Sequence, residues 1–262
     1  MNDPRILITR PADGVARITL ARPQLRNAFD DATIVALTAA FADADADAGV
    51  RVVVLAAEGP AFCAGADLHW MRRMAGYSRE QNLADAAALA EMLRTIAACR
   101  KPTIARVQGD VYAGGMGLVA ACDMAVAVDT ARFCLSEVKL GLVPATIGPY
   151  VIRAMGARAA QRYFLTAERF DAATALALGL VHESVAPAAL DDRVQALVGA
   201  LLEASPEALA LCKRLLHEVS GRPLDATLIA RTAEIIADSR TSADGRHGVE
   251  AFLAKTRPRW QA

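Results

Sequence analysis

One segment of the sequence, residues 60–68, constrains the fold more than any other. It reads P-A-F-C-A-G-A-D-L and follows the apolar run V-R-V-V-V-L-A-A at residues 50–57, which has the length and composition of a buried strand. Gly65 stands between two alanines where this strand is expected to turn towards a helix. Small side chains at such a turn leave backbone N–H groups uncovered, and uncovered N–H groups stabilise negative charge that develops on an oxygen. The segment therefore predicts a strand–turn–helix unit and one half of an oxyanion hole.

A second turn of small residues lies further along the chain, at residues 112–117 (Y-A-G-G-M-G). We expect a short helix over residues 114–121, which places Gly114 at a helix N-terminus, where N–H groups lack acceptors and the helix dipole is positive. The two turns together predict an oxyanion hole made from two loops. An alternative remains open, in which Gly114 and Gly115 only permit close packing. The turn does not match the G-x-G-x-x-G pattern of dinucleotide-binding proteins.

Strands and helices are expected to alternate in the first half of the chain, which indicates parallel strands in a layered α/β core. The expected strands are residues 4–10, 15–21, 50–57, 103–107 and 124–128, with a short extended piece at 133–135. The first two are joined by a hairpin turn at Asp13 and Gly14. The expected helices of this half are residues 30–44, 80–98 and 114–121.

Beyond residue 145 the pattern predicts helices only. These helices are expected at residues 148–155, 157–165, 171–178, 188–203, 206–219, 224–238 and 243–254. Asp171 and Ser205 have the side chains and positions of helix N-caps. A mixed core followed by a helical tail is therefore expected.

The composition is that of a globular protein with a large core, since 54% of the 262 residues are hydrophobic and 22% are charged. The formal net charge is zero, which argues against general nucleic-acid binding because that requires a basic excess. Five cysteines without a C-x-x-C motif are expected to be free thiols in a reducing compartment. We find no signal-peptide pattern and no apolar run near the ~20 residues that span a bilayer. We therefore expect a cytoplasmic protein that does not enter a membrane.

A single acidic residue, Glu137, stands in the largely apolar stretch 133–144 (F-C-L-S-E-V-K-L-G-L-V-P). Burial of an unpaired carboxyl is unfavourable and raises its pKa towards the range that suits proton transfer. The alternative is a surface carboxylate paired with Lys139 or with an arginine. The spacing of the residues leaves both interpretations open.

Other candidate groups indicate no metal or nucleophile chemistry. The four histidines, His69, His182, His217 and His247, form no pattern such as H-E-x-x-H. His69 follows the first turn and is expected either near the site or on an exposed helix face. No G-x-S-x-G motif of a nucleophilic serine occurs. Cys63 is expected to fill space in the core, because no base is identifiable beside it.

The chain resembles the enoyl-CoA hydratase/isomerase (crotonase) family. The resemblance is carried by residues 62–68 (F-C-A-G-A-D-L), 108–123 (Q-G-D-V-Y-A-G-G-M-G-L-V-A-A-C-D) and 133–144. Residues 22–29 (R-P-Q-L-R-N-A-F) and 250–260 (E-A-F-L-A-K-T-R-P-R-W) also fit, so the resemblance covers nearly the whole chain.

The resemblance implies a fold and a set of partners. The fold is α/β, a crotonase-like spiral of ββα units over residues 1–195, followed by a C-terminal helical region over residues 196–262 that builds a trimer or a dimer of trimers. The implied substrates are acyl-CoA thioesters, with no metal or redox cofactor.

The resemblance also implies roles for individual residues. Ala66 and Gly114 supply the N–H groups of the oxyanion hole, and Glu137 is the catalytic carboxylate. The residues implied in contact with CoA are Arg26, Ala28, Ala64, Asp67 and Leu68, together with Phe252 and Lys255, which in the family sometimes belong to a neighbouring subunit.

One departure from the family pattern concerns Gly117. Hydratases of the family that use two glutamates carry one at this position and one at the position of Glu137. The usual pair divides water activation and protonation of the α-carbon. With Glu137 alone, hydration requires one carboxylate to serve both steps or another group to assist. Single-glutamate members include Δ3-Δ2 enoyl-CoA isomerases, in which one base moves a proton between carbons.

The sequence of residues 136–151 (S-E-V-K-L-G-L-V-P-A-T-I-G-P-Y-V) is most similar to sequences of bacterial methylglutaconyl-CoA and carboxygeranoyl-CoA hydratases. Their substrates carry a second carboxylate, for which Arg72 or Arg73 is a candidate partner; the alternative for both arginines is a solvated helix face. Three hypotheses follow: a hydratase, an isomerase, and a CoA-binding subunit with little catalysis.

Overall fold

A six-stranded sheet runs through the molecule and is parallel except at one edge. The computed structural model describes residues 4–261, so the first residues of the predicted core and the last of the predicted helical region lie outside the described residues. The strands of this sheet, in spatial order, are β1 (Ile6–Ala12), β2 (Gly14–Leu20), β3 (Val50–Ala57), β5 (Thr103–Val107), β7 (Met124–Val128) and β10 (Glu183–Val185). β1 and β2 form the predicted hairpin, with Ala12 opposite Val15, and the other pairings in this sheet are parallel.

A second sheet is made of four short strands, β4 (Ala61–Cys63), β6 (Asp110–Tyr112), β8 (Arg132–Cys134) and β9 (Phe170–Asp171). The chain alternates between the sheets, because β3 is followed by β4, β5 by β6 and β7 by β8. Each pair leads into helical structure: α2 (Leu68–Met74) and α3 (Arg79–Ala98), then α4 (Gly114–Ala121), then the 3-10 helix η2 (Glu137–Leu140) and α5 (Gly148–Met155). The predicted spiral of ββα units is confirmed.

The prediction that the chain is entirely helical beyond residue 145 is wrong. β9 pairs antiparallel with β8, and β10 pairs parallel with β7, so both sheets are completed by this part of the chain. These strands are two and three residues long, which is too short for the alternation of apolar and polar residues that identifies a strand. The predicted boundary at residue 195 falls inside α8 (Leu190–Leu202), which packs against β3, β5 and β7.

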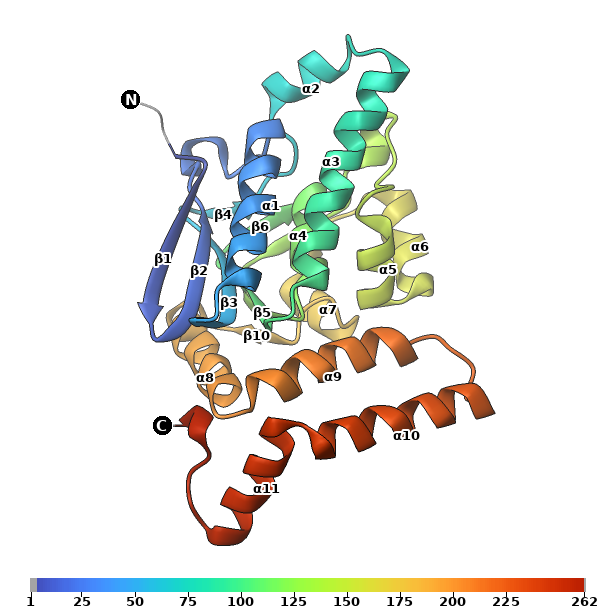
Figure 1. Cartoon of the computed structure of the whole chain (residues 1–262). Helices are drawn as coiled ribbons and strands as arrows, with labels where there is room; N and C mark the ends of the chain where they lie inside the picture. The colour runs from blue at the N-terminus through green and yellow to red at the C-terminus, as the bar shows by residue number, and fades with distance from the viewer. Residues whose placement is uncertain (1–3, 262) are drawn as a thin grey trace.

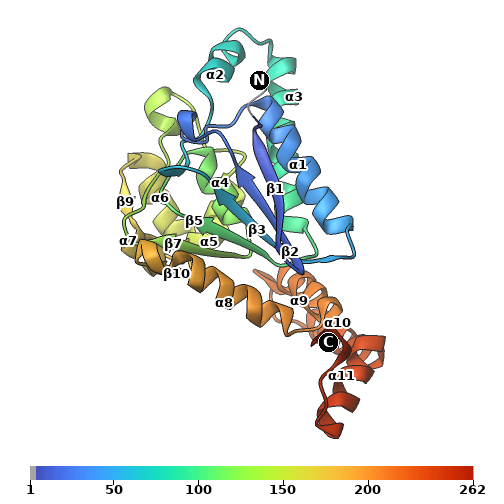
Figure 2. The same cartoon turned by 90° about the vertical axis from the view of Figure 1, so that its left-hand side faces the viewer.

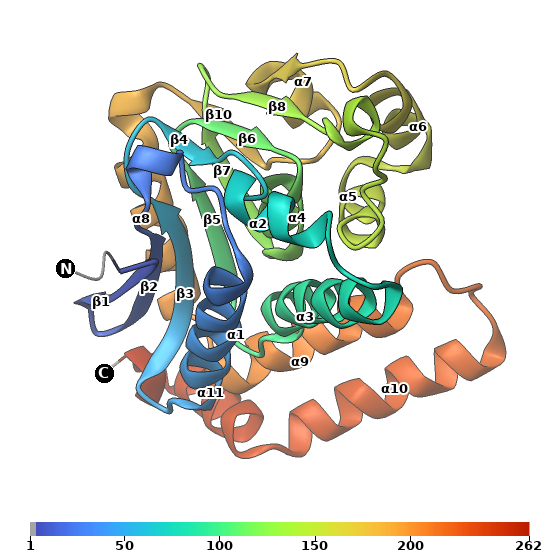
Figure 3. The ribbon, with the colours of Figure 1, turned by 90° about the horizontal axis from the view of Figure 1, so that it is seen from above.

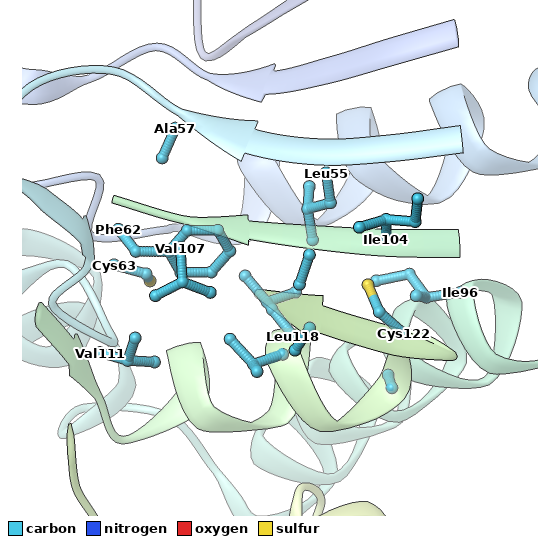
Figure 4. Close-up of a cluster of buried hydrophobic side chains, with 14 of the residues drawn as sticks. Leu55, Ala57, Phe62, Cys63, Ile96, Ile104, Val107, Val111, Leu118 and Cys122 are labelled. Carbon is cyan, nitrogen blue, oxygen red and sulfur yellow. The ribbon is translucent and has the colours of Figure 1, made fainter. Parts of the chain in front are cut away.

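The short helix α4 lies in the middle of the molecule. It contacts β4, β5 and β6 as well as α3 and α5, and the view from above shows it enclosed by these elements (Figure 3). The helix α1 (Asp31–Ala46) packs against α3 and against the hairpin edge of the larger sheet. In the core, Leu55 of β3, Ile104 of β5 and Leu118 of α4 are fully buried and gather between strands and helix (Figure 4).

The C-terminal helices form an arm at one end of the molecule, opposite α2 (Figures 1 and 2). The arm comprises α9 (Pro206–Val219), α10 (Ala226–Thr241) and α11 (Ala243–Ala254). The smaller helices α6 (Ala157–Thr166) and α7 (Ala172–Ala177) lie between α5 and β10 in the chain. Several large apolar side chains of the arm are exposed: Leu216, Leu224, Ile229, Ile236, Val249, Phe252 and Leu253.

The side chain of Arg51 in β3 binds the end of the chain to the core through hydrogen bonds. Its guanidinium donates to the carbonyl oxygen of Trp260 at 2.8 Å and to those of Leu202 and Ala204 at 2.7 Å each. The side-chain amide of Gln261 donates to the Glu203 carbonyl at 2.7 Å. The junction between α8 and α9 and the last described residues are therefore held at one point of the larger sheet.

No single helix within residues 4–261 is long and apolar enough to cross a membrane. Two consecutive helical segments, Pro187–Leu202 and Pro206–Val219, reach the required length and composition only together, and they are bent by 104° at the break between them.

Candidate active site

The N-terminus of α4 begins from a backbone conformation that glycine usually adopts. Ala113 has φ 47° and ψ −121°, and a non-glycine residue held there indicates strain that the surroundings maintain. Its N–H donates to the Cys134 carbonyl and its carbonyl accepts from the Met116 N–H, both at 2.8 Å. The N–H of Gly114, the first helical residue, points out of the helix end and has no acceptor among residues 4–261.

Close packing requires both glycines of this turn. A Cβ on Gly114 would lie 2.4 Å from Cζ of Phe29, and a Cβ on Gly115 would lie 2.8 Å from Cβ of Cys63. The interpretation that these glycines permit close packing is therefore correct. The free N–H of Gly114 is an additional property of the same turn.

A second N–H without an acceptor belongs to Ala66. The Phe29 N–H donates to the Gly65 carbonyl and the Asp67 N–H donates to the Phe29 carbonyl, both at 2.9 Å, so Ala66 lies opposite Phe29 in a parallel bridge. In this pattern the N–H of Ala66 points away from Phe29, and no acceptor within the described chain takes it.

The two turns are in direct contact. Gly65 has φ +91°, and a Cβ on it would lie 3.0 Å from Cβ of Ala113 and 3.8 Å from the nitrogen of Gly114. The residues predicted to form the oxyanion hole, Ala66 and Gly114, are thus brought together by segments far apart in the sequence. Phe29 joins them, since its backbone pairs beside Ala66 and its ring lies against Gly114.

A network of charged side chains, most of them largely buried, holds the segment around Phe29 against this turn. Arg22 donates to the Ala28 carbonyl at 3.1 Å and to a carboxylate oxygen of Asp67 at 3.0 Å. The same guanidinium lies 3.4 Å from Asp30, which also receives two hydrogen bonds from Arg5 at 3.0 Å. Burial opposes ionisation of Asp30, but hydrogen bonds from Arg5 and Thr33 outweigh it and hold the pKa of this carboxyl well below its ordinary value.

The Asp67 side chain is committed to this network. It is 4% exposed, and its other oxygen caps α2 by accepting from the N–H groups of His69 at 2.8 Å and Trp70 at 3.3 Å. The carboxylate is therefore engaged within the protein and turned away from solvent. Only the backbone of Asp67 remains available for the predicted contact with CoA, and this contact stays a prediction.

Glu137 lies at the start of η2, shortly after the β8 residue that binds Ala113. One carboxylate oxygen, Oε2, is buried without a hydrogen-bond partner among the described residues. Burial raises the pKa of this carboxyl above its ordinary value, against a smaller lowering effect of its own backbone N–H. Lys139 donates instead to the Ala167 carbonyl at 2.8 Å, so the alternative of a Glu137–Lys139 pair is wrong. The carboxyl has the burial expected of a proton-transfer group.

The position of the missing second acid is filled by an apolar side chain. A Cβ on Gly117 would lie 2.3 Å from Cγ2 of Ile147 and 3.4 Å from Cδ2 of Leu93. Ile147 is 2% exposed and stands just before α5. No side chain fits at Gly117 unless Ile147 moves.

Most of the residues predicted to contact CoA lie in segments 22–29 and 60–68. These segments meet beside the Gly114 turn, which we call the oxyanion turn. Arg26 and Leu68 are exposed there, Ala64 is half-buried and Ala28 is buried. Phe252 and Lys255 lie at the end of α11, at the opposite end of the molecule from α2 (Figures 1 and 2). Within one chain these two residues are therefore remote from Ala66 and Gly114.

The remaining candidates have structural explanations. Burial raises the pKa of the Cys63 thiol to about 12, which disfavours the nucleophilic thiolate. His69 is exposed on α2, and Arg73 donates to Asp31 at 2.7 Å. All five cysteines are free, as predicted. No group of three or more His, Cys, Asp or Glu side chains within residues 4–261 is placed to hold a metal ion.

Three residues of the site were not identified from the sequence: Phe29, Arg22 and Ile147. Phe29 and Arg22 stand in the segment R-P-Q-L-R-N-A-F, which showed only resemblance and no role for either side chain. No feature of the sequence indicated a role for Ile147, because its contact with Gly117 depends on how α4 and α5 pack.

Comparison with known proteins shows the family of the chain. Residues 10–262 match the family model described as enoyl-CoA hydratase/isomerase. The chain belongs to this family. Enoyl-CoA hydratase ACTT6 of Alternaria alternata is 35% identical over 243 residues, which cover 91% of this chain and 78% of that protein.

Solved structures of the family superpose over almost the whole chain. An enoyl-CoA hydratase from Shewanella pealeana has a TM-score of 0.95 at 42% identity, covering 99% of this chain and 97% of that one. Pseudomonas aeruginosa AtuE has a TM-score of 0.93 at 36% identity, covering 99% and 100%. As a member of the enoyl-CoA hydratase/isomerase family with the crotonase fold, the protein is an enzyme for which an acyl-CoA substrate is implied.

Proposed function

We propose that this family member adds water to the double bond of an α,β-unsaturated acyl-CoA. The observation that carries the proposal is the half-buried Glu137 carboxyl, whose Oε2 has no hydrogen-bond partner among the described residues and which lies just beyond the strand that binds the Gly114 turn. The relatives named enoyl-CoA hydratase support hydration over other reactions of the family.

The mechanism uses the two free N–H groups and one carboxylate. The thioester oxygen accepts hydrogen bonds from Ala66 and Gly114, which are worth about 10²–10³ in rate per donor because they strengthen as the oxygen becomes negative. Ionised Glu137 removes a proton from water, and the water oxygen forms a bond to the β-carbon. The electron pair of the carbon–carbon double bond forms a new double bond between the α-carbon and the carbonyl carbon, and the carbonyl electron pair moves to the thioester oxygen, which gives an enolate. Protonated Glu137 then returns its proton to the α-carbon, so the reaction needs no cofactor beyond the CoA of the substrate.

Double-bond isomerisation is the second candidate, favoured by the apolar environment of Gly117. Ile147 occupies the space where a second acid would stand, so Glu137 is the only carboxylate of the proposed pair. One base is sufficient to remove a proton from the α-carbon of a 3-enoyl-CoA and return it to the γ-carbon through the same enolate.

An assay of 2-enoyl-CoA hydration and 3-enoyl-CoA isomerisation with one enzyme preparation tests the proposal. We expect crotonyl-CoA or methylglutaconyl-CoA to be hydrated faster than 3-hexenoyl-CoA is isomerised. The reverse order would replace hydratase by isomerase. Binding of CoA esters with no turnover of any of the three would favour a CoA-binding subunit.

We further propose that Phe252 and Lys255 contact the CoA bound to a neighbouring copy of the chain. Both are exposed and remote from the oxyanion turn of their own chain, and the arm that carries them exposes a series of large apolar side chains. A trimer, or a dimer of trimers, would cover these side chains. Sedimentation analysis, together with the KM of Lys255→Gln for an acyl-CoA, tests both parts.

A further inference from the structure

Five uncharged hydrogen bonds and one ion pair with residues 22–29 hold the segment that carries Ala66. In the hydrogen bonds, the Asn27 side chain donates to the carbonyls of Glu58 at 2.7 Å and Ala61 at 2.8 Å, the Ala64 N–H donates to the Arg26 carbonyl, and the Phe29 backbone pairs on both sides of Ala66 through two bonds. The charged contact is the Arg22–Asp67 ion pair. Asp67 directly follows Ala66 in the sequence, and the side chains of Arg22 and Asp67 are only 16% and 5% exposed.

We propose that the Arg22–Asp67 ion pair is a positioning device that sets the place and direction of the Ala66 N–H. The inference rests on the proposed oxyanion function and assigns Arg22 and Asp67 as positioning residues, since neither is placed to touch the reacting atoms.

The geometry of Arg22 explains how the pair acts. One guanidinium nitrogen donates to the Ala28 carbonyl, directly before Phe29, and the other donates to Asp67, directly after Ala66. The parallel bridge between Phe29 and Ala66 is thus clamped on both sides by one rigid, planar group. The Phe29 ring in turn lies against Gly114, which carries the other donor. A change in the Arg22–Asp67 distance therefore changes the separation of the two N–H groups.

Positioning of this kind has a distinct kinetic signature. A donor misplaced by about 1 Å costs as much as ~10²-fold in rate, because its hydrogen bond to the developing oxyanion is no longer aligned. Binding of the CoA portion does not depend on this alignment. We therefore expect the turnover number to fall while the affinity for a saturated acyl-CoA is retained.

Asp67→Asn is the test variant. Asparagine keeps the size of the side chain and remains a good N-cap for α2, but it removes the charge that binds Arg22. Arg22→Lys is the second variant, because lysine keeps the charge but cannot reach Ala28 and Asp67 with one planar group. Asp45→Asn is the matched control. Asp45 is also a partly buried aspartate that pairs with an arginine, Arg100, and that arginine lies outside the segments that form the site.

The measurement compares the affinity for acetoacetyl-CoA with the affinity for butyryl-CoA. The enolate form of acetoacetyl-CoA places negative charge on the thioester oxygen, whereas butyryl-CoA has no enolate of comparable stability. The ratio of the two affinities is the preference for the enolate. We expect Asp67→Asn and Arg22→Lys to reduce this preference and the kcat at least tenfold, with butyryl-CoA affinity changed less than about twofold. Asp45→Asn is expected to lower the melting temperature but to leave both the preference and the kcat unchanged.

The proposed oxyanion hole and the proposed positioning role can be overturned separately. If the unsubstituted enzyme shows no preference for the enolate, the proposed oxyanion hole is wrong. If it shows the preference and Asp67→Asn keeps it while the melting temperature falls, the pair is only structural and the positioning role is overturned.

Discussion

The side chain of Ile147 occupies the space into which any side chain at Gly117 would extend, since a Cβ on Gly117 would lie 2.3 Å from Cγ2 of Ile147. We expect Gly117→Ala to destabilise the protein by about 1–3 kcal/mol through overpacking, despite the higher helix propensity of alanine. In an Ile147→Ala background the same substitution is expected to cost less, with a coupling free energy of about 0.5–3 kcal/mol. Urea unfolding of the four proteins measures it. Additive effects would show that the two side chains do not compete for space.

Glu137→Gln is expected to abolish most of the activity and to increase stability. Removing a positioned general base typically costs about 10²–10⁴ in rate. The buried Oε2 has no partner within the described chain, so replacing a carboxylate by a neutral amide of the same shape removes a desolvation penalty. Steady-state kinetics and thermal unfolding at pH 8 measure the two effects. Near-normal turnover of this variant would remove Glu137 from the mechanism.

The activity is expected to fall on the acid side at a higher pH than an ordinary glutamate would give. Burial raises the pKa of Glu137 above the ordinary 4.5, and the ionised form is the base, so kcat/KM declines as pH falls through this raised pKa. Because the folded state holds the proton more tightly than the unfolded state, ionisation of Glu137 destabilises the fold. The stability deficit relative to Glu137→Gln is therefore absent at low pH and appears as pH rises through the folded-state pKa. A deficit that grows towards low pH would contradict the assignment.

Arg72 is expected to discriminate between substrates if the acyl group carries a second carboxylate. Arg73 is bound to Asp31, whereas no ion pair of Arg72 occurs among the described residues. Arg72→Gln should then raise the KM for methylglutaconyl-CoA several-fold and leave crotonyl-CoA unchanged. Arg79→Gln, which changes a nearby charge on α3, is the control. Equal effects on both substrates would indicate a contact with CoA instead.

Arg51→Met is expected to loosen the C-terminal arm. The substitution removes the donor shared by three backbone carbonyls, and each carbonyl left without a partner costs about 1–3 kcal/mol where water cannot replace the arginine. Hydrogen exchange should increase in α9–α11 more than in β3. Unchanged exchange in the arm would show that its own packing is sufficient to hold it.

The sequence predicted the parts of the fold that have long or patterned segments. The apolar run of β3, the helical spacing of apolar residues in α1 and the alanine- and leucine-rich segment of α3 were identified correctly, because each is long enough to show a characteristic pattern or composition. The four strands of the smaller sheet have two or three residues each, and only β8 was noticed, as a short extended piece. Their pairing depends on contacts between distant segments, which no local pattern records.

The two turns and the acid of the candidate site were predicted, whereas the side chains of Phe29, Arg22 and Ile147 that pack or bind around them were not. Ala66 and Gly114 lie together as expected, and Oε2 of Glu137 is buried with no partner within residues 4–261; turns of small residues and an isolated acid are visible in a sequence. Asp67 was predicted to contact CoA, and this contact stays a prediction, whereas its pairing with Arg22 and its capping of α2 were not foreseen, since the residue type alone does not distinguish a ligand contact from a helix cap.

Both proposed electrophilic groups of the site are main-chain N–H groups, as the turns at Ala66 and Gly114 show. Substitution by any residue except proline leaves such a group in place, whereas the one acid, Glu137, is open to loss, gain or relocation at a single codon. A scaffold of this kind keeps its ability to stabilise an enolate while mutation changes what becomes of the enolate. Descendants of such a chain can therefore diverge in reaction without first losing the intermediate that they share.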